Sequence, residues 1–124
     1  MTVTYSGGVL LESTPNAEEP FVLARGFTVT WMRDGQETVK FIVRKGFTTD
    51  LASIPRVARS IIPQVGRHIQ PAIVHDWAYE DHTDLTRAEA DMLFLEGMKA
   101  VGMPWLRRNV MYAAVRAFGR GLWG

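Results

Sequence analysis

The chain has 124 residues, of which 47% are hydrophobic, and a formal net charge of +1. This length and composition allow one domain with a substantial core, and the near-neutral charge excludes a general polyanion binder, so no nucleic-acid partner is expected. The absence of cysteine excludes a disulfide scaffold and a thiolate metal site. The sequence shows no signal peptide and no apolar run of about 18 residues that could span a membrane.

The clearest β-structure is predicted within the first 50 residues. Apolar and polar side chains alternate from residue 27 to 31, and the alternation returns from residue 37 to 44. A period of two is typical of half-buried strands. Asp34-Gly35, between the two segments, suits a tight turn. We therefore predict a β-hairpin over these residues.

The other segments of the N-terminal half carry weaker signals. Residues 9–11 are predicted as a short strand and residues 13–20 as an exposed loop. Turn-forming and small polar residues break the strand pattern between residues 46 and 55. A short helix is predicted from residue 56 to 62, where Pro63 ends it.

Three helices are predicted in the C-terminal half. The first runs from about residue 68 to residue 80 or 81. The capping box Thr86-Arg87-Ala88-Glu89 marks the start of the second, which ends near Gly102. Pro104 suits the first turn of the third helix, which continues to Gly119.

The predicted fold class is therefore α+β. A β-hairpin or meander in residues 1–50 precedes a bundle of about three helices in residues 66–120. No internal repeat or low-complexity segment divides the sequence. Residues 1–124 are accordingly predicted to form a single domain.

Four side chains of the first two helices form a candidate acid–base site. His75 and Tyr79 are four residues apart and share a helix face, whereas Asp76 is about 100° round the helix and points elsewhere. Asp91 lies in an apolar stripe, where an unpaired carboxylate is costly. If the helices are antiparallel neighbours, His75 is its natural partner, at about 2.6–3.2 Å between heavy atoms. The set predicts an oriented general base, and Asp76 is left over for a metal ion.

Each of these side chains also has a purely structural interpretation. A single histidine within an apolar helix, such as His75, is commonly a core residue with its hydrogen bonds satisfied. Asp91 can tether its helix to a loop, and Tyr79 can be an amphipathic core residue. The residue types alone leave both interpretations open.

The same segment carries the patterns of other site chemistries. His68, His75 and His82 are seven residues apart, about 10 Å of rise per step, so one helix cannot bring them to a single zinc ion. The dipeptide His75-Asp76 alone is a weak indication of a phosphohydrolase, because the additional upstream histidine is absent. Asp76 together with backbone carbonyls is a better cation site, and an all-oxygen ligand set favours calcium.

The last predicted helix has two interpretations. Its apolar residues alternate with arginines, and tryptophans stand at either end, at Trp105 and Trp123. One interpretation is an amphipathic core helix with a solvated basic face. The other is an interfacial surface that meets anionic phosphates, with the tryptophans at headgroup depth.

The order His75-Asp76-x-x-Tyr79, followed by Ala90-Asp91-x-x-Phe94 and Met98, resembles the helix pair of secreted-type phospholipase A2. The short bacterial, fungal and parvoviral form is the most similar. Residues 112–119 resemble the helix that ends the fungal-type domain. The resemblance covers about the last 50 residues and implies a phospholipase A2-like helical core.

This resemblance implies calcium-dependent hydrolysis of lipid esters. His75 would be the base that activates water, Asp91 would orient its imidazole, and Tyr79 would hydrogen-bond that aspartate. Asp76 would bind calcium, which would polarise the ester carbonyl. The family's glycine-rich calcium loop and its disulfides are not recognisable here, and Asp50 is the substitute candidate for a further metal ligand.

A second resemblance covers nearly the whole chain. Residues 46–55, with the sequence GFTTDLASIP, and His75-Asp76-Trp77 resemble a family of small phage and prophage proteins known only as a domain of unknown function. The combined expectation is a phage-type protein, in the host cytoplasm or the virion, that hydrolyses lipid esters of the host envelope. The alternative is a non-catalytic virion or tail component with other phage structural proteins as partners. A third interpretation is a hydrolase of another envelope polymer, such as peptidoglycan.

Overall fold

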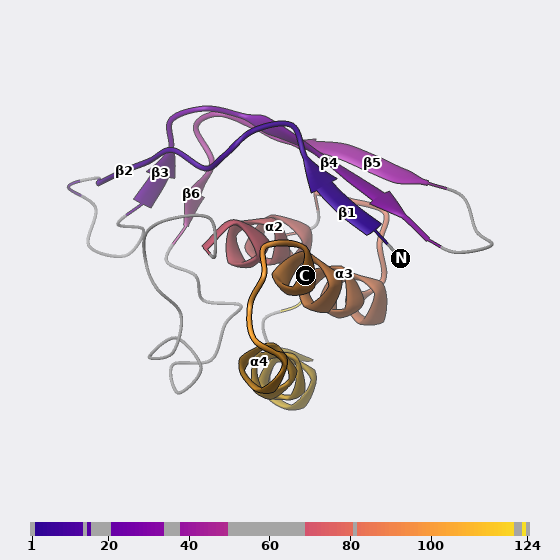
Figure 1. Cartoon of the computed structure of the whole chain (residues 1–124). Coiled ribbons are helices and arrows are strands. Elements are labelled where there is room, and N and C mark those ends of the chain that lie inside the picture. The colour runs from indigo at the N-terminus through magenta and orange to yellow at the C-terminus, as the bar shows by residue number, and fades with distance from the viewer. Residues whose placement is uncertain are drawn as a thin grey trace.

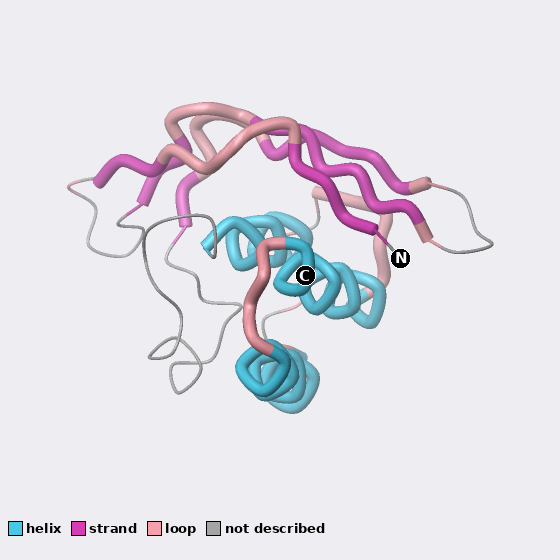
Figure 2. Tube along the Cα trace, in the orientation of Figure 1, coloured by secondary structure: helices cyan, strands magenta, loops and turns pink. Residues whose placement is uncertain are grey.

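Strands, a pair of helices and a further helix lie one beneath the other in the protein (Figure 1). The computed structural model describes residues 2–13, 15, 21–33, 38–49, 69–80, 82–120 and 123. Figure 2 shows that the strands all belong to the upper part and the helices to the lower part. The described N-terminal half contains antiparallel strands, and three helices follow. The predicted α+β class is therefore confirmed.

The larger part of the strand layer is an antiparallel sheet in the order β1-β4-β5. Its strands are β1 (Thr2–Tyr5), β4 (Phe27–Met32) and β5 (Val39–Val43). The last two pair with Val29 opposite Phe41, as a hairpin requires. The predicted hairpin strands are confirmed, and the Asp34-Gly35 turn lies outside the described residues.

The second sheet is smaller and has the order β2-β3-β6. It consists of β2 (Leu11–Ser13), β3 (Phe21–Leu23) and β6 (Thr48–Thr49). The predicted strand at residues 9–11 is thus displaced toward the C-terminus. Tertiary pairing explains the difference, because Leu11 lies opposite Leu23 on β3. The short helix predicted at residues 56–62 lies outside the described residues.

Helix α2 (Gln70–Tyr79) is buried along its whole length, polar residues included. It lies beneath the strands and beside α3, and each of its residues is buried (Figure 1). Pro71, near the N-terminus, suits the first turn, where a missing N–H costs no hydrogen bond. Buried polar side chains on such a helix need partners, and Gln70 finds one in the carbonyl of Gly7 at 2.7 Å.

The other two helices among the described residues are α3 (Arg87–Ala100) and α4 (Trp105–Phe118). The capping box at the start of α3 is present as predicted: Thr86 accepts from the Glu89 amide, and the Glu89 carboxylate accepts from the Thr86 amide. After α3 the chain turns at Gly102, whose φ of 80° favours glycine. Pro104 is the N-cap of α4 rather than a residue of its first turn.

The main core lies between the strands and the inner helices. It combines inward-facing strand residues such as Val29 and Trp31 with residues of α2 and α3 such as Ile73 and Phe94. Within the described residues, no helix is long and apolar enough to cross a membrane.

Candidate active site

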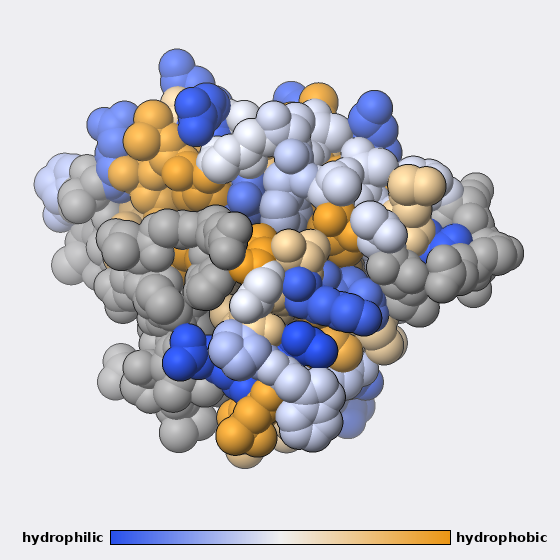
Figure 3. All heavy atoms as spheres, in the orientation of Figure 1, coloured by the Kyte–Doolittle hydropathy of each residue, from blue (hydrophilic) through white to orange (hydrophobic). Residues whose placement is uncertain are grey.

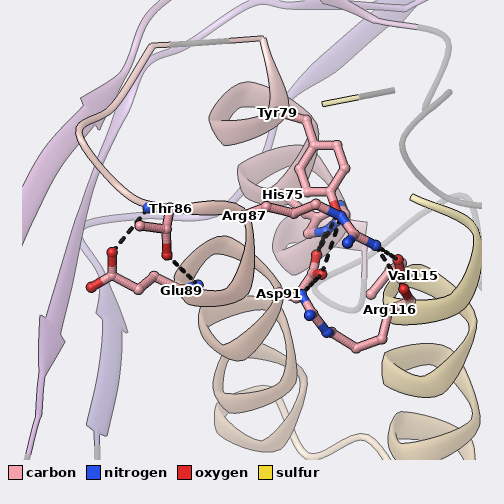
Figure 4. A network of polar contacts seen from close by, with 8 residues as sticks. All are labelled: His75, Tyr79, Thr86, Arg87, Glu89, Asp91, Val115 and Arg116. Atoms are coloured by element: carbon pink, nitrogen blue, oxygen red, sulfur yellow. Dashed lines mark hydrogen bonds and ion pairs between the residues drawn. The ribbon is translucent and has the colours of Figure 1, made fainter. Parts of the chain in front are cut away.

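The two inner helices bring the predicted acid–base residues together. His75 and Tyr79 lie one turn apart on α2, and Asp91 lies on α3 facing them (Figure 4). His75 and Asp91 are joined by a hydrogen bond of 2.7 Å between Nε2 and Oδ1. This distance lies within the range of about 2.6–3.2 Å that was predicted for the pair.

The same carboxylate oxygen receives a second hydrogen bond. The Tyr79 hydroxyl donates to Oδ1 of Asp91 at 2.6 Å. The imidazole of His75 also packs against the rings of Tyr79 and Phe94, with ring centroids 4.2 and 4.7 Å away. These contacts hold the imidazole in one orientation relative to the carboxylate.

Two arginines that were not among the predicted site residues complete the network. Arg116, on α4, donates from Nη1 to Oδ2 of Asp91 at 2.8 Å. Arg87, on α3, donates from Nε to the Tyr79 hydroxyl at 3.2 Å and lies 4.0 Å from Oδ2 of Asp91. Asp91 therefore has cationic or hydrogen-bonding partners on three helices. We call these five side chains the Asp91 network (Figure 4): His75, Tyr79, Arg87, Asp91 and Arg116.

Arg87 also fastens the end of α4. Its Nη2 donates to the backbone carbonyls of Val115 at 3.0 Å and Arg116 at 2.7 Å. The Val115 carbonyl also accepts from the backbone N–H of Gly119 at 2.9 Å, and a cation at the C-terminal end of a helix complements the helix dipole. The spacing in the sequence is the signal that could have indicated the contact between Arg87 and Asp91, since the two residues are an i, i+4 pair.

A glycine allows the chain after α4 to approach the network closely. A Cβ at Gly119 would lie 2.6 Å from the Tyr79 hydroxyl and 2.6 Å from the carbonyl oxygen of Val115. Both distances are far below van der Waals contact. The absence of a side chain at Gly119 therefore leaves the Tyr79 hydroxyl room to bond Asp91.

The network sets the protonation states of its acid and its base. Burial raises the pKa of Asp91, but hydrogen bonds from His75, Tyr79 and Arg116 outweigh it, so the pKa lies below its usual value. Burial lowers the pKa of His75, while Asp91 raises it less. The charge of Arg87 lowers this pKa as well. At neutral pH the pair is a carboxylate and a neutral imidazole.

This protonation state determines which imidazole nitrogen can act as a base. An ionised carboxylate only accepts hydrogen bonds, so Nε2 of His75 carries the proton that it donates to Asp91. The lone pair of the neutral ring then lies on Nδ1. In this tautomer Nδ1 is the ring nitrogen with a lone pair for a proton.

We predict that stability falls as the pH drops through about 6.5, the ordinary histidine pKa. Between that value and the lowered pKa of folded His75, the unfolded chain binds a proton that the folded chain does not, so acid favours unfolding. Asp91, whose folded pKa is also lowered, adds a further loss below about pH 4. Urea denaturation between pH 8 and pH 3 measures both steps.

The matched variants for this pH dependence are His75→Gln and His82→Gln. His82 is exposed, so its replacement should leave the loss below about pH 6.5 unchanged, whereas His75→Gln should remove that loss. An unchanged pH profile in His75→Gln would contradict the assignment.

Asp76 points away from the network, as its position on the helix predicts. It is 5% exposed, and Thr49 of β6 donates a hydrogen bond to its Oδ2. Asp50, the other expected calcium ligand, lies outside the described residues. Among the residues that are described, no three His, Asp or Glu side chains gather as a metal site would require. One carboxylate is not the six to eight oxygens that calcium takes, so the described residues alone do not fit the ion.

The histidines are placed in separate surroundings. His75 belongs to the Asp91 network, whereas His82 stacks on Trp77 with ring centroids 3.9 Å apart. His68 lies outside the described residues. The side chains of His75 and Asp91 have an exposed fraction of 0%, so water reaches the pair only when neighbouring groups move.

Comparison with known proteins places the network in a family context. A family model described as "Protein of unknown function (DUF1353)" matches residues 22–115. An "Uncharacterized protein y4jT" from Sinorhizobium fredii (strain NBRC 101917 / NGR234) is 33% identical over 88 residues, which are 69% of this chain and 26% of that protein. The chain thus spans about a quarter of that relative's length. No solved structure matches the chain. The family match includes four residues of the Asp91 network and ends directly before Arg116.

Proposed function

The chain belongs to the DUF1353 family of proteins of unknown function, and from this premise we propose that it is a phospholipase A2-like hydrolase of lipid esters. The observation that carries the proposal is the hydrogen bond of 2.7 Å between His75 and Asp91. It places an oriented imidazole beside a buried carboxylate, the arrangement of a general base and its orienting acid. A phage-type protein acting on the host envelope would use such a site against phospholipid.

The proposed reaction uses His75 as the group that moves a proton. As the oxygen of a water molecule bonds to the ester carbonyl carbon, the water proton passes to Nδ1 of His75. The proton then passes to the alcohol oxygen as the ester C–O bond breaks, which yields a fatty acid and a lysophospholipid. Asp91 stabilises the imidazolium that exists between the two transfers.

Tyr79 and the arginines act through Asp91. Hydrogen bonds from Tyr79 and Arg116 keep the carboxylate ionised and its oxygens directed. Because the imidazole is buried, the ester must arrive together with a displacement of the side chains around it. Exclusion of bulk water from such a site strengthens its electrostatic interactions.

A specific observation supports a second function, that of a non-catalytic phage virion or tail component. Asp91 has an exposed fraction of 0% and joins side chains from α2 and α4 to α3. A fully paired buried carboxylate of this kind can serve to specify helix register without any chemistry. Under this alternative the protein would cleave neither phospholipid nor peptidoglycan.

The test turns on Asp76 and calcium. A ligand that binds only the folded state raises stability by mass action, and calcium affinity depends on the number of carboxylate ligands. If Asp76 and residues near Asp50 bind calcium, millimolar calcium should raise the melting temperature, and Asp76→Asn should abolish the rise. The amide oxygen of the variant can still accept from Thr49, so the fold should persist.

The controls separate a calcium site from general charge effects. Asp84→Asn changes an exposed acid of the same region and should melt like the wild type with and without calcium. Magnesium, which demands stricter geometry, should shift melting less. Hydrolysis is followed in parallel as fatty acid released from phospholipid vesicles. Identical melting of wild type and Asp76→Asn, with no release by either protein, would refute the hydrolase proposal and favour the structural component.

A further inference from the structure

Helix α4 has an apolar face that the rest of the described structure does not cover. Leu106, Val110, Ala113 and Ala117 are all exposed, and their spacing of i, i+4, i+7 and i+11 places them along one side of the helix. The exposed fraction is 67% for Leu106 and 48% for Val110. We call these four residues the outer face of α4.

The outer face of α4 does not take part in the core. α4 packs on α3 through its opposite side, where Met111 and Val115 are buried. Leu106 and Val110 lie in solvent instead. Figure 1 shows α4 as the outermost layer, on the side of the molecule away from the sheets. An exposed apolar stripe that no other element packs against commonly marks a contact surface.

Aromatic and cationic residues surround the outer face. Trp105 and Phe118, at the two ends of the helix, are each 66% exposed. Arg107 and Arg120 are exposed as well, and no Asp or Glu occurs in the sequence after Glu96. Figure 3 shows hydrophobic and strongly hydrophilic residues side by side at the lower pole of the molecule, where α4 lies. The surface is apolar along its centre and positively charged at its margins.

This charge pattern discriminates between possible occupants. A second copy of the chain, docked through the same face, would bring arginines of both copies together with no acid of the C-terminal segment to neutralise them. A helix of 14 residues is too short to cross a bilayer. An anionic lipid surface instead offers acyl chains to the apolar stripe and phosphates to the arginines.

We propose that the outer face of α4 docks the protein on the surface of an anionic phospholipid bilayer. The helix lies in the plane of the interface, with Leu106 and Val110 directed into the acyl boundary and Arg107 and Arg120 at the phosphates. This inference deepens the proposed function and rests on it for the choice of lipid. It assigns to α4 the task of bringing the chain to its substrate.

Binding to vesicles made of ether-linked phospholipids tests the proposal without any hydrolysis. Cosedimentation is measured with vesicles containing phosphatidylglycerol and with purely zwitterionic vesicles. The wild type should bind the anionic vesicles more tightly, and added salt should weaken the binding. The double variant Leu106→Gln/Val110→Gln should bind about tenfold or more weakly, since it lacks two apolar side chains that become buried when the protein binds the bilayer.

Matched variants on the opposite side of the molecule provide the controls. Met32→Gln/Ile42→Gln alters two apolar residues of the sheet that are both 56% exposed, and it should bind vesicles like the wild type. Arg107→Gln/Arg120→Gln should lose the preference for anionic vesicles, whereas Arg44→Gln/Lys45→Gln, in exposed positions after β5, should keep it.

Three results would overturn the proposal. The first is that the wild type fails to bind the vesicles. The second is that the sheet variants weaken binding as much as the α4 variants do. The third is that sedimentation equilibrium shows a dimer that the substitutions Leu106→Gln/Val110→Gln dissociate. The last result would assign the face to a second copy. A chain that binds ether-lipid vesicles but cleaves no ester-linked phospholipid would refute the proposed hydrolysis alone, so the two failures are distinguishable.

Discussion

Replacing Asp91 by alanine is expected to lower the free energy of unfolding by about 3–5 kcal/mol, the usual cost of removing one partner from a buried ion pair. The change leaves the Nε2–H of His75 and the hydroxyl of Tyr79 without their acceptor. It also removes the anion that Arg116 contacts at 2.8 Å. The side chain of Arg116 is 37% exposed, so water can take up part of its charge, which favours the lower end of this range.

Urea denaturation followed by circular dichroism measures this effect. The control is Asp84→Ala, because Asp84 is an exposed acid just before α3 and its loss should change stability by less than about 0.5 kcal/mol. For a domain of this size the Asp91 variant should also melt about 10 °C or more below the wild type. Equal stability of the two variants would show that Asp91 is not the centre of the network.

Replacing His75 by glutamine is expected to reduce phospholipid hydrolysis by about 10²–10⁴-fold, the usual contribution of a general base. The glutamine amide can still donate to Asp91, so the variant should lose much less stability than Asp91→Ala. It has no group that accepts a proton at the position of Nδ1. The activity should therefore collapse while the fold remains.

The comparison with His82→Gln makes this result specific. His82 is exposed and stacks on Trp77, outside the Asp91 network, so hydrolysis should be unchanged in that variant. Activity is followed as fatty acid released from ester-linked vesicles, and folding is followed by denaturation in the same buffer. Full activity in a folded His75→Gln protein would exclude His75 as the base.

Several features of this protein could be predicted from the sequence because neighbouring residues specify them. The alternation before and after Asp34-Gly35 identified the strands β4 and β5, since side chains on a strand face opposite sides in turn. Thr86 and Glu89 marked the start of α3, because a capping box closes its hydrogen bonds within four residues.

The hydrogen bond between His75 and Asp91 could also be anticipated, for an energetic reason. Asp91 lies in an apolar stripe with Phe94 and Met98, and a carboxylate buried there without a partner would be too costly. The sequence offered a histidine on the preceding helix as the nearest suitable partner. A local pattern together with the cost of desolvation was sufficient for this contact.

Packing between segments that are far apart in the sequence decided the other features of the fold and of the site. β1 pairs with β4 across more than 20 residues, with Val3 opposite Trp31, and its four residues are too few to show a clear period. The bond from Arg116 to Asp91 exists only because α4 lies against α3. Helical spacing cannot reveal such a contact, because it orders residues within a helix and not between helices.

The two sides of α4 show the same division between what the sequence determines and what the tertiary structure determines. The sequence determined that Leu106, Val110, Met111 and Val115 belong to an amphipathic helix. Only the tertiary structure decided that Met111 and Val115 enter the core while Leu106 and Val110 remain in solvent. The reason is physical: a helix with two apolar stripes can bury either one, and the position of the neighbouring helix selects which stripe loses its contact with water.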